Sequence, residues 1–137
     1  MNKACPVVLR ERNGELQILA FEHPLAGKQI VKGTIEPNES LESACIRELA
    51  EESGLEAEVL SSLSIWESEF DGQVWGFCLM KLSKEAPDKF KYFTLDDGGH
   101  YFEFFWQPLR SELSINWHSL FKGAIAHINK ELLEKAR

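Results

Sequence analysis

Apolar and β-forming residues gather in runs that short polar segments separate, and this pattern predicts a sheet-rich domain. Asn13-Gly14 and Asp71-Gly72 each lie between two such runs, and both dipeptides favour a tight hairpin turn. The strands on either side of each turn are expected to pair antiparallel. The predicted strands are residues 4–10, 15–22, 29–31, 57–70, 73–82, 90–95 and 100–108.

The second hairpin brings Trp66 and Trp75 near its turn, where the two rings are expected to pack against each other across the strands. A polar loop is predicted at residues 83–91, and a break in the strand pattern at residues 96–99. The last strand alternates strictly. Its two faces carry Phe102, Phe104 and Trp106 on one side and Tyr101, Glu103 and Phe105 on the other.

Two segments have helical patterns. In the first, Ser40 or Asn38 can cap the start and Gly54 fits the left-handed position after the end, while Ile46 and Leu49 supply an apolar side. Residues 115–135 form the second, an amphipathic closing helix whose apolar positions are Trp117, Leu120, Phe121, Ala124, Ile128 and Leu132.

The first predicted helix concentrates negative charge, because Glu48, Glu51 and Glu52 are three and four positions apart and share one face. Like charges at these spacings destabilise a helix by about 0.2–0.5 kcal/mol per pair unless a cation neutralises them. Hard oxygen ligands suit Mg²⁺ or Mn²⁺, and Mg²⁺ commonly keeps water and substrate phosphates as further ligands. A bare acidic triplet is more often a solvated helix face, so the surrounding residues decide between the two interpretations.

The residues around this acidic triplet follow the spacing of a known sequence motif. Residues 33–55 resemble the Nudix box, G-x5-E-x7-R-E-U-x-E-E-x-G-U with U an aliphatic residue, and this degree of agreement is specific. The nine specified positions are all matched, at Gly33, Glu39, Arg47, Glu48, Leu49, Glu51, Glu52, Gly54 and Leu55.

The Nudix resemblance implies a loop-helix-loop that binds divalent cations and a metal-dependent pyrophosphohydrolase that cleaves a nucleoside diphosphate linked to another moiety. It makes Glu48, Glu51 and Glu52 metal ligands and pairs Arg47 with Glu39. Either Glu48 or Glu52 would act as general base. The alternative from another class is a nucleotide-sensing module that keeps the fold without turnover, which a broken carboxylate set would favour.

Two residues depart from commoner versions of the box. Asn38 stands where Gly is frequent before Glu39, and Asn tolerates a left-handed backbone. Lys32 precedes Gly33, and this K-G entry is similar to that of Nudix diadenosine polyphosphate hydrolases, although Val31 stands where their Pro would be. Lys32 and Gly33 are therefore candidate substrate-binding residues, and the substrate is expected to be a dinucleoside polyphosphate or nucleoside triphosphate.

Many Nudix proteins use a further acidic group from a segment shortly before a Trp. Glu103 resembles that group here, with Asp96, Asp97 and His100 as rivals.

The fold that the resemblance and the order of elements imply is an α/β/α sandwich with a mixed β-sheet, formed by residues 1–137 as a single domain. A formal net charge of −7 opposes non-specific binding to nucleic acid. The three widely spaced cysteines predict reduced thiols. A cytoplasmic monomer or homodimer acting on a small phosphate-containing nucleotide is expected, since no secretory signal or membrane span is recognisable.

Overall fold

The computed structural model describes residues 1–135, apart from the side chain of Asp97. Within these described residues the two helices are α1 (Leu41–Ser53) and α2 (Ser119–Lys135), and one short 3-10 turn, η1, covers Asp96–Gly98. The strands are β1 (Lys3–Arg12), β2 (Glu15–His23), β3 (Gly27–Gln29), β4 (Gly33–Thr34), β5 (Ala57–Ser62), β6 (Trp66–Glu67), β7 (Val74–Leu82), β8 (Phe90–Thr94) and β9 (His100–Pro108).

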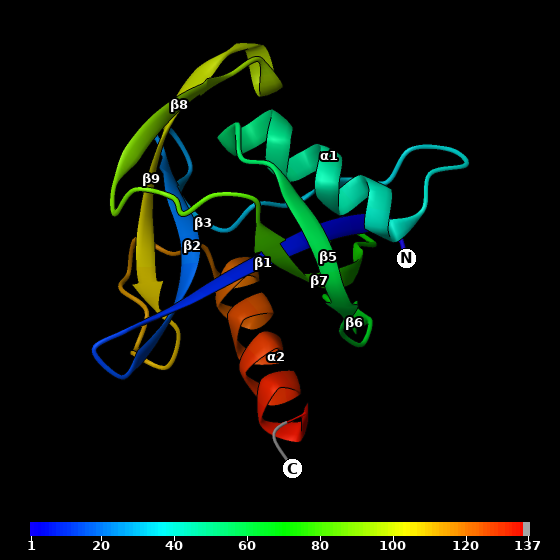
Figure 1. Ribbon diagram of the computed structural model, residues 1–137. Helices are drawn as coiled ribbons and strands as arrows, with labels where there is room; N and C mark the ends of the chain where they lie inside the picture. Colours follow the sequence, from blue (N-terminus) through cyan, green and yellow to red (C-terminus); the bar gives the residue numbers. More distant parts are fainter. Residues whose placement is uncertain (136–137) are drawn as a thin grey trace.

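The strands form one mixed sheet, with the order β5-β7-β1-β2-β9-β8 along its main path. Strand β1 connects the two halves of this sheet. Its first part pairs in parallel with β7, from Lys3 opposite Trp75 to Val8 opposite Met80. Its last part pairs antiparallel with β2. The two halves diverge from β1 in Figure 1, which leaves room for a helix on each side.

The two helices cover opposite faces of the sheet (Figure 1). Successive side chains of a strand point to opposite faces of the sheet, so neighbouring residues of β1 contact different helices. Ala4 packs in a cluster with Cys45 and Leu49 of α1, whereas Cys5 packs in a second cluster with Phe121 of α2. The predicted α/β sandwich with a mixed sheet is confirmed.

Both predicted hairpins are present. Asn13 and Gly14 have positive φ angles of 53° and 78°, and this backbone joins β1 to β2 with a two-residue turn. In the second hairpin Trp66 lies opposite Trp75, and the two rings meet edge to face with centroids 5.4 Å apart.

One long predicted strand, residues 57–70, is instead divided into β5 and β6. The break occurs at Ser64, whose backbone N–H donates to the Glu131 carboxylate of α2 at 2.7 Å rather than to a neighbouring strand. A hydrogen bond to a helix 67 positions away leaves no pattern in the local sequence.

The structure also corrects two boundaries. The short strand predicted at residues 29–31 lies earlier, in β3, and a separate strand β4 begins the acidic loop-helix segment. Helix α2 begins at Ser119 rather than at residue 115. His118 accounts for this start, because its Nδ1 accepts the backbone N–H of Leu120 at 3.0 Å and so caps the helix.

Among the described residues, neither helix is long and apolar enough to cross a lipid bilayer.

Candidate metal and catalytic site

Helix α1 is bounded as its sequence predicts. The Ser40 hydroxyl accepts the backbone N–H of Ser43 at the start, and Gly54 ends the helix with φ 75°. Asn38 adopts φ 64°, the left-handed conformation predicted for it. The loop from β4 and the helix therefore form one continuous unit that fixes where the acidic side chains of α1 lie.

Arg47 ties this loop to the helix. Its guanidinium donates to both carboxylate oxygens of Glu39, at 2.7 and 2.8 Å, and to the backbone carbonyl oxygen of Thr34 at 3.0 Å. It also donates to Glu48 at 2.8 Å and to Glu51 at 3.2 Å. The Arg47 hydrogen bond is the largest cause that lowers the pKa of Glu39 to about 2, and Glu39 in turn raises the pKa of Arg47. The predicted pair is present and is bidentate.

Three carboxylates meet beside this loop. Glu48 and Glu52 of α1 and Asp96 of η1 each place one oxygen within 4.8 Å of the others. Glu48 and Glu52 are almost buried, with exposed fractions of 6% and 5%. Burial, followed by a hydrogen bond that the protonated Glu52 donates to Glu48 and by the charges of Glu48 and Asp96, raises the pKa of Glu52 well above its usual range. The three carboxylates repel one another and offer only oxygen ligands. Both features fit a site for a divalent cation such as Mg²⁺ or Mn²⁺.

Glu51, the third predicted ligand, lies outside this group of three. Its side chain is 46% exposed and is held by Arg47. Partial burial and the nearby Glu48 raise the pKa of Glu51, whereas Arg47 opposes the shift. Glu51 therefore borders the acidic cluster of Glu48, Glu52 and Asp96, and it shares Arg47 with Glu48.

The structure brings Asp96, and not Glu103, into the acidic cluster. Glu103 lies on β9 with its carboxylate 3.8 Å from Lys91 of β8. Phe102 and Phe104, its neighbours in sequence, pack in the core cluster beneath α1, so Glu103 points to the opposite face of the sheet. Of the other two rivals, His100 packs its ring 4.8 Å from that of His23. The side chain of Asp97 lies outside the described part of the chain.

Gly33 lies against the buried carboxylate of Glu48. A Cβ atom at this position would be 1.9 Å from Glu48 Cδ, much closer than atoms can approach. The absence of a side chain at Gly33 is thus what allows Glu48 to occupy its place in the acidic cluster.

We expect Gly33→Ala to weaken Mg²⁺ binding by about 10- to 100-fold, because the new methyl group displaces Glu48. Isothermal titration with Mg²⁺ measures the effect. Thr34→Ala is the control, since it changes the next residue without adding an atom near Glu48. Equal Mg²⁺ affinity in the parent and in Gly33→Ala would contradict this role of Gly33.

Lys32 lies on the α2 side of the sheet, beside rings of the core cluster that α2 covers. Its Nζ lies 3.5 Å from Gln73 Oε1, 5.4 Å from the ring centroid of Trp75 and 5.8 Å from that of Phe121. Partial burial lowers the pKa of Lys32, and the Lys3 charge lowers it further, while Glu52 and, more weakly, Glu48 act in the opposite direction. Lys32 is thus a half-buried cation rather than a solvated loop residue.

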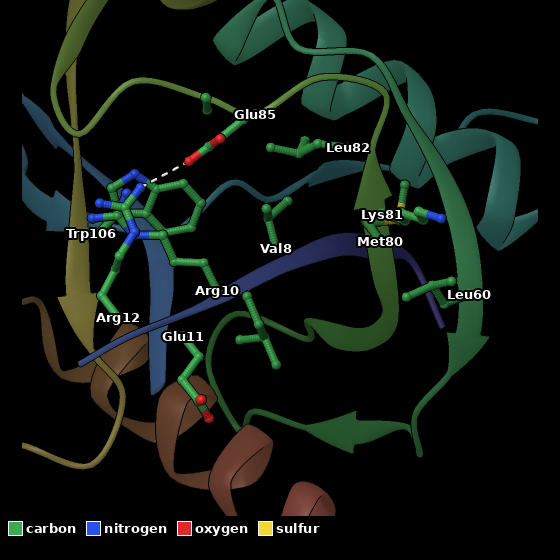
Figure 2. A pocket seen from close by; sticks show the side chains of 12 residues that line it. Val8, Arg10, Glu11, Arg12, Leu60, Met80, Lys81, Leu82, Glu85 and Trp106 are labelled. Carbon is green, nitrogen blue, oxygen red and sulfur yellow. Dashed lines mark hydrogen bonds and ion pairs between the residues drawn. The ribbon is translucent and has the colours of Figure 1, made fainter. Parts of the chain in front are cut away.

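A separate hollow of about 350 Å³ lies on the sheet away from these residues. Figure 2 shows Trp106 and Arg12 on one side of it and Leu60 and Met80 on the other. Arg12 donates to Glu85 at 3.0 Å, and the Arg10 guanidinium stacks 4.4 Å from the Trp106 ring centroid. These contacts hold the loop after β7 against the sheet and bring none of the box residues into the hollow.

The chain matches a known family and resembles several solved structures. The family model described as NUDIX domain matches residues 2–119. Over 96% of this chain and 96% of its own, a Caenorhabditis elegans Ap4A hydrolase has a similar crystal structure, with 21% identity and a TM-score of 0.59. An ADP-ribose pyrophosphatase from Streptococcus suis has 15% identity and a TM-score of 0.60, over 93% of this chain and 90% of its own.

A third similar crystal structure, of a UDP-X diphosphatase, has 9% identity and a TM-score of 0.64. The match covers 93% of this chain but only 62% of the diphosphatase chain. At these identities the three structures establish a shared fold. The search of curated proteins found no match.

Proposed function

The chain belongs to the NUDIX domain family, and we propose that it is a metal-dependent hydrolase that cleaves a phosphoanhydride bond in a nucleoside diphosphate derivative. The observation that supports this most strongly is the meeting of Glu48, Glu52 and Asp96 within 4.8 Å on a loop-helix unit fixed by Arg47. The three similar proteins, whose descriptions are Ap4A hydrolase, ADP-ribose pyrophosphatase and UDP-X diphosphatase, agree with this reaction class.

Glu48, Glu52 and Asp96 would hold the cation, and Glu51, which shares Arg47 with Glu48, would be a further ligand. When bound, Mg²⁺ or Mn²⁺ neutralises phosphate charge and makes a bound water more acidic. Arg47 donates to Glu48 and thereby fixes the direction of that carboxylate. Either Glu48 or Glu52 would take the proton from the attacking water as general base.

A nucleotide-binding module without turnover is the second candidate. Such a module has no need of the complete acidic set, whereas Glu48, Glu51 and Glu52 are all present and the first two are both bonded to Arg47. The intact set favours the hydrolase.

We further propose that the preferred substrates have several consecutive phosphates, such as a dinucleoside polyphosphate or a nucleoside triphosphate. The support is Lys32, a half-buried cation that packs over the rings of Trp75 and Phe121 and directly precedes Gly33, the residue that lies against Glu48. A half-buried cation attracts phosphate oxygens more strongly than one in bulk water, and a longer phosphate chain gains more from it.

Measuring kcat/KM with Mg²⁺ for Ap4A, ATP, ADP-ribose and NADH tests both the hydrolase activity and the preference for substrates with several consecutive phosphates. We expect Ap4A or ATP to be cleaved fastest and Lys32→Ala to lower their kcat/KM about tenfold more than that of ADP-ribose. Lys84→Ala, which removes an exposed lysine from the loop after β7, serves as the control.

Absence of metal-dependent release of phosphate or nucleotide from all four compounds would contradict the hydrolase. A faster reaction with ADP-ribose or NADH, or an equal loss for all four compounds in Lys32→Ala, would contradict only the preference for polyphosphates.

A further inference from the structure

Asp96 joins the acidic cluster from a part of the chain that is remote from the box. It is the first residue of η1, the turn between β8 and β9, whereas Glu48 and Glu52 lie on α1. Carboxylates from two separate elements can hold one cation only if those elements keep a fixed separation. Strand β8 packs against α1 and leads directly into η1, so β8 is the element that sets this separation.

Tyr92 of β8 packs against the end of α1. A Cβ atom at Gly54 would lie 2.5 Å from Cε1 and 2.9 Å from Cδ1 of the Tyr92 ring, so the ring occupies the space that a side chain at Gly54 would need. Gly54 thus has a second role besides ending the helix with φ 75°. The contact fixes β8 against the last turn of α1, the turn that carries Glu52.

Thr94 is two positions further along β8, on the same face of the strand as Tyr92. Its side chain is buried, and its hydroxyl accepts the backbone N–H of Asp96 at 3.3 Å, an arrangement typical of a turn closed by Thr. The backbone carbonyl of Asp96 accepts the N–H of Gly99 at 3.1 Å. Both backbone polar groups of Asp96 are therefore bonded, and this fixes the direction in which its side chain leaves the backbone.

The residues that alternate with Tyr92 and Thr94 point away from α1. Phe93 is 47% exposed and contacts Tyr101 of β9, and Leu95 is 84% exposed. At this end of β8, Tyr92 and Thr94 are thus the residues that face α1.

We propose that Tyr92 and Thr94 are positioning residues that hold Asp96 within reach of the cation bound by the acidic cluster. The proposal rests on the proposed function, because it requires a metal at that cluster. Tyr92 sets the distance between β8 and α1, and Thr94 sets the direction of the Asp96 side chain. Replacing groups that orient metal ligands typically lowers metal affinity by about 10- to 100-fold.

Mn²⁺ binding, followed by electron paramagnetic resonance, tests the role of Thr94. Thr94→Val removes the hydroxyl at nearly constant volume, and Thr94→Ser is the matched control because it keeps the hydroxyl. We expect Thr94→Val to weaken Mn²⁺ binding about tenfold and Thr94→Ser to bind as the parent does. In an Asp96→Asn background, Thr94→Val should weaken the binding no further, because Thr94 acts through Asp96.

A second pair of variants tests the contact between Tyr92 and Gly54. Tyr92→Leu removes the ring that packs against Gly54, whereas Tyr92→Phe keeps the ring and removes only its hydroxyl. We expect Tyr92→Leu to weaken Mn²⁺ binding about tenfold and Tyr92→Phe to leave it unchanged.

Amide hydrogen exchange of Asp96, measured by NMR without metal, provides a readout that does not depend on the cation. The exchange should be slower in the parent and in Thr94→Ser than in Thr94→Val, because only Val lacks the acceptor for this N–H.

Mn²⁺ affinity equal to that of the parent in both Thr94→Val and Tyr92→Leu would overturn the proposal. A loss caused by Thr94→Val that is as large in the Asp96→Asn background as in the parent would overturn it too, because a general loss of stability gives that result. Absence of Mn²⁺ binding by the parent would instead contradict the metal centre, so failure of the proposed function and failure of this positioning role give different results.

Discussion

Replacing Glu52 with Gln is expected to lower kcat by about 10³-fold, the scale of losing a positioned acid–base group, while the chain stays folded. Glu52 is 5% exposed and meets Glu48 and Asp96, so the amide removes one charge from the acidic cluster without changing its volume. Release of nucleotide or phosphate at saturating Mg²⁺ measures the loss.

The stability of Glu52→Gln should change in the opposite direction. Without metal, burial and the neighbouring Glu48 and Asp96 disfavour a charge at Glu52, so the neutral variant should melt at a higher temperature than the parent. Added Mg²⁺ should stabilise the parent and have little effect on the variant.

Glu42→Gln is the control for this experiment, because Glu42 is an exposed acid in the first turn of the same helix. A kcat for Glu52→Gln equal to that of Glu42→Gln would mean that the acidic cluster is not the catalytic centre.

Arg47→Ala should lose both stability and activity. The guanidinium makes charged hydrogen bonds to Glu39, Glu48 and Glu51 and one hydrogen bond to the Thr34 carbonyl. Its side chain is 23% exposed, so solvent weakens these contacts only in part. We expect the free energy of unfolding to fall by about 2–4 kcal/mol, with a loss of kcat of at least about tenfold because Glu48 is no longer oriented.

Chemical denaturation and steady-state kinetics measure the two effects of Arg47→Ala. Arg10→Ala is the control that separates the loss of stability from the loss of kcat. Arg10 also makes an ion pair, with Asp88 at 2.8 Å, but it lines the hollow in Figure 2. Arg10→Ala should lower stability without lowering kcat. An Arg47→Ala protein with the stability of the parent would show that Arg47 does not hold the loop.

The parts of the site that could be predicted from the sequence are local. Ser40, Gly54 and Asn38 act on a backbone within a few residues, and Arg47 pairs with Glu39 only eight positions away in one loop-helix unit. Such features have residue preferences of their own, so a single sequence is sufficient to recognise them.

Asp96 could be named only as one of several rivals, because its position depends on long-range structure. It is 44 positions after Glu52 in the sequence, and the pairing of β8 with β9 brings it back to α1. Glu103 illustrates the same difficulty. Strict alternation already places it on the face opposite to Phe102 and Phe104, but which face α1 covers is decided by the packing of the whole sheet.

The division of the predicted strand at residues 57–70 has a similar origin. The hydrogen bond from Ser64 to Glu131 joins a strand end to the last helix, and local β-propensity contains no information about that partner.

Mn²⁺ binding, followed by electron paramagnetic resonance, tests the metal centre most directly because it requires neither substrate nor turnover. We predict that the parent binds Mn²⁺, that Glu52→Gln and Asp96→Asn each weaken the binding at least about tenfold, and that Glu103→Gln binds as the parent does. Absence of binding by the parent, or a loss in Glu103→Gln as large as that in Asp96→Asn, would contradict a metal centre formed by Glu48, Glu52 and Asp96.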